Sequence, residues 1–276
     1  MSGTFSRSFQ LVKESFAVLK RDKKLLWFPI ISSIVIILLL MSFIIPIYFF
    51  TGIKIKEITN IYLEYILYLA YFFVFYLLSY FIVMFFNTGL MTCVYIRLNG
   101  GDPALRDGFK NAAKHIGKIF IWALVSATFG VVLQAIAEKS KTLGRIVVAI
   151  AGITWSLLTF FVVPVMIFEN LSVPHSIKKS GYLFKKTWGE KVFGQFSISL
   201  FFLFLVLIGV SILSVLFFKT DLFTILLIAY LVILEIIISG LNVIFATALY
   251  IYASTGKIPP AFSPEVIKNA FVPKTS

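Results

Sequence analysis

Long apolar stretches separated by short polar segments dominate the chain. Each stretch approaches or exceeds the roughly 20 residues that a helix needs to cross about 30 Å of hydrocarbon. Two of them, 61–96 and 222–252, exceed that need, so we expect them to tilt or to project beyond the membrane. The pattern predicts an all-α fold, a polytopic transmembrane bundle of about six spanning helices. The predicted spans are residues 25–50, 61–96, 119–136, 146–168, 196–218 and 222–252.

Two of these spans contain a proline. Pro46 and Pro164 each lie near one end of the apolar stretch that contains them. Proline removes a helical hydrogen bond and collides with the preceding turn. We therefore expect each of these two helices to bend near that end.

Lysine and arginine are distributed unevenly among the segments between the spans. Nineteen of the 25 lie in the terminal segments and the two long loops, and six lie in the other three loops. Because basic residues are retained on the cytoplasmic side of a membrane, this bias predicts a multi-pass cell-membrane protein with both termini in the cytoplasm. The predicted single integral membrane domain, 1–276, comprises an N-terminal amphipathic helix (1–24), the bundle (25–252) and a cytoplasmic tail (253–276).

Three basic segments, near residues 1–24, 103–118 and 172–191, repeat an apolar position every three or four residues, the spacing of one helix face. They predict amphipathic helices at the membrane surface, with lysines directed at the anionic headgroups of the lipid bilayer. The same stripes also fit helices that pack on the bundle, and the sequence favours neither alternative. The stripes are Phe5, Phe9, Val12, Phe16 and Leu19; Leu105, Phe109, Ala112 and Ile116; and Val173, Ile177, Gly181, Phe184 and Trp188. The candidate headgroup contacts are Lys110, Lys114, Lys178, Lys179, Lys185 and Lys186.

Part of the second predicted span recurs in the sixth. The matched positions, 155 residues apart, are Asn87 and Asn242, Thr92 and Thr247, Tyr95 and Tyr250, Ile96 and Ile251, and Gly101 and Gly256. The fourth span ends on a similar run, Asn170-Leu-Ser-Val-Pro174. The matches predict a unit of two spanning helices and a surface helix. We expect this unit three times in the same orientation, unlike the inverted repeats of many transporters.

Three stretches carry a resemblance to known proteins. They are Asn99-Gly-Gly-Asp-Pro103, Trp155-Ser-Leu with Thr159-Phe-Phe-Val-Val-Pro164, and Lys178-Lys-Ser180 with Lys186-Thr-Trp-Gly-Glu190. With them, the chain resembles a widespread archaeal and bacterial family of six-helix integral membrane proteins of unknown function. The resemblance covers most of the chain, from the basic N-terminus to the fifth span. It implies an integral membrane bundle and no assigned activity.

Composition excludes several classes of function. Charged residues make up 13% of the chain, against about 25% in soluble domains, which is too few to cover a water-soluble surface. Cys93 is the only cysteine, and His115 and His175 are the only histidines, so we expect no disulfide framework and no metal site. No phosphate-binding loop or catalytic motif occurs, so we expect no enzymatic activity and no cofactor.

The net charge of +13 would suggest a nucleic-acid partner in a soluble protein. Here the basic residues are accounted for by the membrane face that they mark. No motif that combines aromatic and basic residues for base recognition occurs in the chain, so nucleic acid is not indicated as a partner.

One acidic residue lies inside the last apolar span. Glu235 shares a helix face with Ser239 and Asn242, and Asn87 and Gln134 are polar residues of other spans that it could meet. Because a charged acid at the bilayer centre costs about 2.5–3.5 kcal/mol on insertion scales, we expect Glu235 to point into the bundle and to be largely neutral. Two roles remain open for it: a hydrogen-bonding link between helices, or a proton or cation site.

Two classes of function remain open. The charge distribution favours a noncatalytic membrane module that organises lipid or binds a partner through its basic helices. That partner would be the anionic bilayer surface, a membrane protein or, in a homo-oligomer, another copy of the chain. The polar stripe around Glu235 supports the alternative, a transporter or channel-like protein for a small solute, ion or lipid. Buried polar groups are otherwise scarce, which opposes a hydrophilic pathway.

Overall fold

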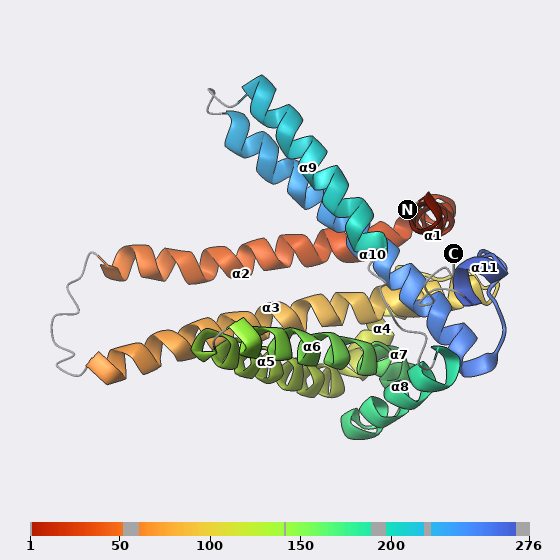
Figure 1. Cartoon of the computed structure of the whole chain (residues 1–276), viewed down its shortest axis with the longest axis horizontal. Helices are drawn as coiled ribbons and strands as arrows, with labels where there is room; N and C mark the ends of the chain where they lie inside the picture. Colours follow the sequence, from red (N-terminus) through yellow and green to blue (C-terminus); the bar gives the residue numbers. More distant parts are fainter. Residues whose placement is uncertain (1, 52–60, 141, 189–196, 218–221, 269–276) are drawn as a thin grey trace.

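The protein is built of helices (Figure 1). A computed structural model describes residues 2–51, 61–140, 142–188, 197–217 and 222–268, and these contain no strand. A short 3-10 turn, Lys23–Leu26, joins the first two helices. The α-helices are α1 (Ser2–Arg21), α2 (Trp27–Thr51), α3 (Ile61–Leu98), α4 (Leu105–Lys114), α5 (Ile116–Lys139), α6 (Thr142–Leu158), α7 (Val162–Phe168), α8 (Val173–Trp188), α9 (Ser197–Phe217), α10 (Leu222–Thr255) and α11 (Pro264–Lys268).

Five segments of the described chain are long and apolar enough to cross a membrane. They are Lys23–Pro46, Ile66–Leu98, Ile116–Lys139, Gly144–Phe168 and Leu222–Thr255. The remaining predicted span, the fifth (196–218), corresponds to α9, an apolar helix of 21 residues whose side chains are described only in part. The prediction of an all-α polytopic bundle is therefore confirmed.

The long helices form three antiparallel pairs, each joined by an aromatic side chain. In α2 and α3, the Tyr71 hydroxyl donates to the carbonyl of Phe43. In α5 and α6, the rings of Phe129 and Trp155 stack with centroids 4.0 Å apart. In α9 and α10, the Tyr230 hydroxyl donates to the carbonyl of Leu205 at 2.7 Å. Aromatic rings therefore hold each pair together where the surroundings are apolar.

The three pairs converge at one end and diverge at the other. Figure 1 shows α9 and α10 leaning away from the other two pairs, while α1, α4, α8 and α11 gather at the shared end. We call these four helices, with α7 and the adjoining ends of α3 and α10, the basal layer. Both the first and the last described helix belong to it.

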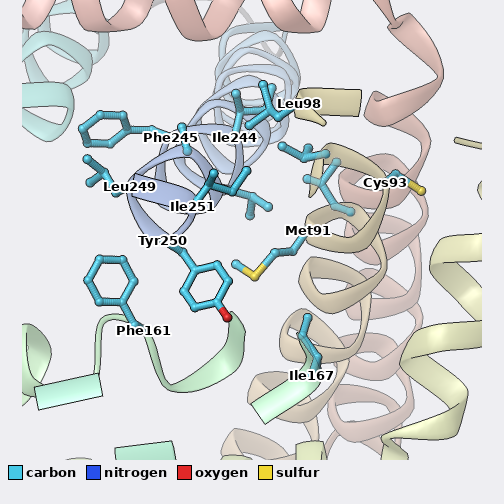
Figure 2. Packing of buried hydrophobic residues seen from close by; sticks show 14 of the residues in the cluster. Met91, Cys93, Leu98, Phe161, Ile167, Ile244, Phe245, Leu249, Tyr250 and Ile251 are labelled. Atoms are coloured by element: carbon cyan, nitrogen blue, oxygen red, sulfur yellow. The ribbon is translucent and has the colours of Figure 1, made fainter. Parts of the chain in front are cut away.

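The hydrophobic core lies in the basal layer. Leu90 and Val94 of α3 and Ile244 and Leu249 of α10 are fully buried there, as is Met166 of α7. Figure 2 shows the side chains of α10 lying between those of α3 and the segment around Phe161. The last turns of α3 and α10 therefore belong to a protein core, and the projection of these two helices beyond the membrane stays a prediction.

The other ends of the long helices expose apolar side chains. Leu38 of α2 is 64% exposed, Val147 of α6 65% and Ile225 of α10 64%. In water such a surface would be strongly unfavourable, whereas lipid chains solvate it. The diverging ends therefore have the surface expected of a membrane-embedded part.

The basal helices bury one face against the bundle. In α8, Val173 and Phe184 are buried, and Ile177 and Gly181 are partly buried, as the predicted stripe requires. The side chain of Trp188, the last member of that stripe, lies outside the described residues. In α4, Ala112 is buried, and Leu105 and Phe109 are partly buried. These stripes pack on the bundle, while their lysines remain outside the contact.

Two positions of the predicted stripes are wrong. Phe16 of α1 is 48% exposed, because Ser15, Val18 and Leu19 form the buried face instead. Ile116 is 49% exposed, because the backbone leaves the helical conformation at His115 and Ile116 begins a new helix. The side chains of Phe5 and Phe9 lie outside the described residues.

The fourth predicted span is two helices rather than one bent helix. The chain leaves the helix at Thr159–Phe161, and α7 begins at Val162, so that Pro164 lies in its first turn. Proline is tolerated there because the first amides of a helix have no intrahelical acceptor. The amide freed by the break, that of Phe161, donates to Ser180 Oγ of α8 at 2.9 Å. By contrast, α2 continues through Pro46 as one helix.

The three helix pairs end in similar ways. A residue with positive φ follows each pair: Gly100 (+89°), Asn170 (+55°) and Gly256 (+73°). A short segment then leads into α4, α8 or α11; Pro103 and Pro259 lie in the first and third of these segments, and Pro174 lies in the first turn of α8. This arrangement agrees with the predicted unit of two spanning helices and a surface helix. The glycines with positive φ, Gly100 and Gly256, are 156 residues apart, so at the exits the two units differ by one residue from the predicted match of Gly101 with Gly256.

Candidate functional site

A groove lies between α2 and the α9–α10 pair, where the helix pairs begin to diverge. It encloses about 470 Å³ and is open on one side. Residues between Pro29 and Ile37 of α2 and between Leu231 and Ser239 of α10 form most of its walls, with Val83 of α3 and Val206 of α9. This volume lies within the roughly 300–1,000 Å³ of small-molecule sites.

The groove lies at the end of the membrane next to the basal layer. Trp27, at the start of α2, is 52% exposed and follows two exposed lysines, as interfacial tryptophans do. A Cβ built on Gly240 of α10 would lie 3.8 Å from Leu26 Cδ2, so Gly240 is level with that boundary. Glu235 precedes Gly240 by five residues, which is about 7.5 Å along a helix. In a bilayer whose boundary runs at Trp27, the carboxyl would lie within the adjoining leaflet.

The surroundings of Glu235 differ from the predicted ones. The sequence places it near the middle of one apolar span, at the bilayer centre and facing the bundle interior. The structure exposes its side chain in the open groove instead. The predicted burial in the bundle interior is wrong, because the groove between α2 and α10 is open beside Glu235. Its depth in the bilayer stays a prediction.

Polar groups of three helices accompany Glu235. Ser239 lines the groove, and its hydroxyl lies 3.5 Å from Asn87 Oδ1 of α3, the limit of a weak hydrogen bond. Ser32 and Ser33 of α2 line the opposite wall, and Ser33 donates to the carbonyl of Pro29 at 2.8 Å. Of the predicted set, Glu235 and Ser239 thus line the same groove, and Asn87 contacts Ser239. The two serines of α2 were not predicted, because isolated serines in an apolar helix carry no distinguishing pattern.

The other two predicted partners of Glu235 lie elsewhere. Gln134 is exposed on α5, where its amide donates to Glu138 Oε1 at 2.9 Å. It does not line the groove, so the predicted meeting with Glu235 is wrong. Asn242 is exposed on α10, beyond the groove on the side of the basal layer.

The surface of the basal layer carries many basic side chains. Of the candidate headgroup lysines, Lys110, Lys114, Lys178, Lys185 and Lys186 are exposed. Lys179 is different, because it forms an ion pair with Glu169 at the end of α7. Further exposed basic residues of this layer are Lys13, Lys20, Arg21, Lys23, Lys24, Arg106, Lys257 and Lys268.

Apart from Glu265, which is exposed on α11, the acids of the described basal layer are engaged in internal contacts. Arg97 binds both Asp22 and Asp102. Asp107 accepts from the amide of Ala104 at 3.0 Å and so caps α4. Glu14 accepts from the amide of Ser263 at 3.1 Å and joins α1 to the start of α11. These acids stabilise the fold and neutralise little of the exposed basic surface.

The described residues offer no ligand set for a metal. No three His, Cys, Asp or Glu side chains among them cluster in a way that could hold an ion. His115 is 4% exposed, its Nδ1 lies 2.9 Å from the carbonyl of Asn111, and Cys93 is buried close to α4. These two side chains therefore belong to the contact between α3, α4 and α5.

These features define the class of the protein: an all-α, polytopic membrane protein with an apolar groove and a basic layer at one end. The chain belongs to DUF6159, a family of unknown function whose model matches residues 66–259. This match confirms membership of a family without an assigned activity; a wide archaeal and bacterial distribution stays a prediction. No curated protein and no solved structure matches the chain.

Proposed function

We propose that the protein is a noncatalytic, multi-pass module of the cell membrane that binds anionic lipid headgroups. In this proposal the basal layer and both termini lie in the cytoplasm. The exposed lysines of α4 and α8 attract the headgroups of the adjoining leaflet. The helix pairs anchor this basic surface at a fixed height above the leaflet.

The proposal rests on lysines that are exposed while the neighbouring acidic side chains are already bound to other groups. Within the described part of the basal layer, Asp22, Asp102 and Glu169 are paired with Arg97 or Lys179, whereas Lys110 and Lys185 stand exposed. Each lysine near an anionic leaflet contributes about 1 kcal/mol, and the attraction is screened within a Debye length. Several such lysines on one surface favour anionic over neutral lipid.

Lipid retention by the purified full chain tests this proposal. The chain is incubated with equal amounts of phosphatidylglycerol and phosphatidylcholine, and the retained lipids are counted by native mass spectrometry. We expect the wild type to retain mainly phosphatidylglycerol. A variant with Lys110, Lys114, Lys178 and Lys185 all changed to Gln should lose that preference, by about fivefold for each lysine.

The control removes charge from the opposite end of the molecule. Lys139 and Arg145 lie there, and both are exposed. The double variant Lys139→Gln and Arg145→Gln should therefore keep the preference for phosphatidylglycerol. Equal retention of the two lipids by the wild type, or equal losses in both variants, would contradict a headgroup site on the basal layer.

Transport is the second candidate. The groove supports it, because Glu235 and Ser239 line a space that opens between helix pairs. A transporter of a small solute, ion or lipid would need a continuous polar path, to which Gln134 and Asn242 do not contribute. Solute uptake by proteoliposomes under a proton gradient separates the two candidate functions. Only a transporter should show a pH-dependent flux, and Glu235→Gln should abolish that flux.

A further inference from the structure

Glu235 has no basic partner in the helices that form the groove. Within the described ranges of α2, α3, α9 and α10, Arg97 is the only basic residue, and it is bound to Asp22 and Asp102. The carboxyl is therefore the only charged group on the groove wall, and the rest of the wall is largely apolar. A charge at this depth is unfavourable unless a group of opposite sign meets it.

Two of the three serines on the groove wall, Ser33 and Ser239, offer acceptors rather than donors. The hydroxyl hydrogen of Ser33 is directed at the carbonyl of Pro29, and that of Ser239 at Asn87 Oδ1. A hydroxyl whose hydrogen is used still carries lone pairs that can accept. The polar face of the groove thus combines an anion with two acceptors, which complements a ligand rich in N–H donors.

The groove also restricts the size and route of a ligand. A volume of about 470 Å³ suits a small molecule rather than a whole phospholipid. The opening lies between helices whose exposed side chains are apolar, as Ile37 and Leu231 show at the groove itself. A ligand that reaches it from the leaflet must be apolar enough to enter the membrane.

We infer that the groove between α2 and α10 binds a small membrane-partitioning primary amine. In this arrangement the ammonium pairs with the carboxylate of Glu235 and donates to Ser33 and Ser239. The apolar part of the ligand lies against Ile36 and Val206, which line the same space. This site is distinct from the headgroup surface of the basal layer and takes a ligand of opposite charge, so the two proposals stand or fall separately.

Binding of octylammonium to the full chain tests the inference. The purified protein is placed in nanodiscs of phosphatidylcholine, which carry no net charge, and binding is measured by calorimetric titration. Octanol and octanoate serve as neutral and anionic ligands of the same chain length. We expect octylammonium to bind best, and Glu235→Gln to weaken it roughly tenfold or more, as loss of a charge-assisted hydrogen bond does.

Two controls separate the site from general effects. Glu138→Gln removes an acid that lies outside the groove on α5, and it should leave octylammonium binding unchanged. Octyltrimethylammonium keeps the charge without N–H donors, so it should bind more weakly than octylammonium. Equal binding of octanol and octylammonium, or no effect of Glu235→Gln, would overturn the inference.

Photo-crosslinking of the wild type keeps the inference testable if Glu235→Gln does not fold. An octylammonium analogue with a diazirine on its chain is activated in the nanodisc, and the adducts are located by mass spectrometry of peptides. We expect adducts within residues 29–37 and 231–239, in competition with unlabelled octylammonium. Adducts confined to other segments would overturn the assignment of the groove.

Discussion

The guanidinium of Arg97 donates to Asp22 Oδ2 at 2.6 Å and joins the end of α3 to the segment between α1 and α2. Only 4% of the Asp22 side chain is exposed, whereas Asp102, the other acid bound by Arg97, is 80% exposed. A carboxylate removed from water needs hydrogen bonds that replace its hydration. Arg97 supplies these bonds and so allows Asp22 to lie inside the basal layer.

Replacing Arg97 should therefore destabilise the protein. In Arg97→Gln the carboxylate of Asp22 stays buried without its cationic donor, and we expect a loss of about 1.5–3 kcal/mol in unfolding free energy. Thermal unfolding in detergent measures this as a lower midpoint temperature. Asp102→Asn is the matched control, because an exposed pair contributes about 0–1 kcal/mol. Equal shifts for both variants would show that burial of Asp22 is not the cause.

The contact between α3 and α4 depends on glycine at position 108. A Cβ at Gly108 would lie 2.5 Å from the carbonyl oxygen of Gly89 and 2.9 Å from Cys93 Sγ. Forcing extra volume into such a contact costs about 1–3 kcal/mol. We expect Gly108→Ala to lower the unfolding midpoint in detergent. Gly117→Ala adds the same methyl on α5 where nothing lies within 4 Å, and it should leave the midpoint unchanged or higher.

The sequence predicts the bundle well because the length of an apolar run is a direct physical constraint in a membrane. Backbone groups in lipid must bond within a helix, so a run of about 20 apolar residues has few alternatives. The basal helices were predicted for a related reason, since the spacing of Val173, Ile177 and Phe184 leaves one apolar face to cover. Whether lipid or protein covers that face depends on contacts far apart in sequence.

The surroundings of Glu235 could not be predicted, because hydropathy does not distinguish a protein core from lipid. Ile244 and Leu249 are as apolar as Ile225, yet the first two lie in the basal core and the last is 64% exposed. One uninterrupted apolar run therefore covers two environments. The residues that contact Glu235 could not be predicted for the same reason. Which polar groups of two helices meet depends on how far one helix is shifted along the other, and the sequence does not give that shift.

Asn170 provides a test of the repeated helix exits. Its φ of +55° disfavours most side chains, and Lys118 Nζ donates to both its carbonyl, at 2.8 Å, and its side-chain oxygen, at 2.7 Å. We expect Asn170→Ala to cost about 1–2 kcal/mol, because a left-handed conformation is strained for alanine. Asn170→Gly should cost less, since glycine adopts that conformation readily. Unfolding midpoints in detergent compare the two, and a milder effect of Ala than of Gly would contradict the role of φ.

The orientation of the basal layer is open to a direct labelling test. The nineteen-to-six bias of Lys and Arg predicts that this layer faces the cytoplasm. Cys93 is the only cysteine and is 1% exposed, so Cys93→Ala gives a background without native thiols and with a modest change in volume. Single cysteines are then introduced at two positions on opposite sides of the predicted membrane. Lys110→Cys lies on exposed α4, and Ile55→Cys lies in the segment between α2 and α3, outside the described residues.

A maleimide that does not cross membranes should label Ile55→Cys on intact cells. It should label Lys110→Cys only after the membrane is permeabilised, because the bilayer then no longer shields the basal layer. Labelling both variants after detergent extraction confirms that each thiol is reactive, so a missing signal on intact cells reports on sidedness. Labelling of Lys110→Cys on intact cells would place the basal layer outside. The lysines would then face the outer leaflet, and the proposed attraction to anionic lipid would have to be sought there.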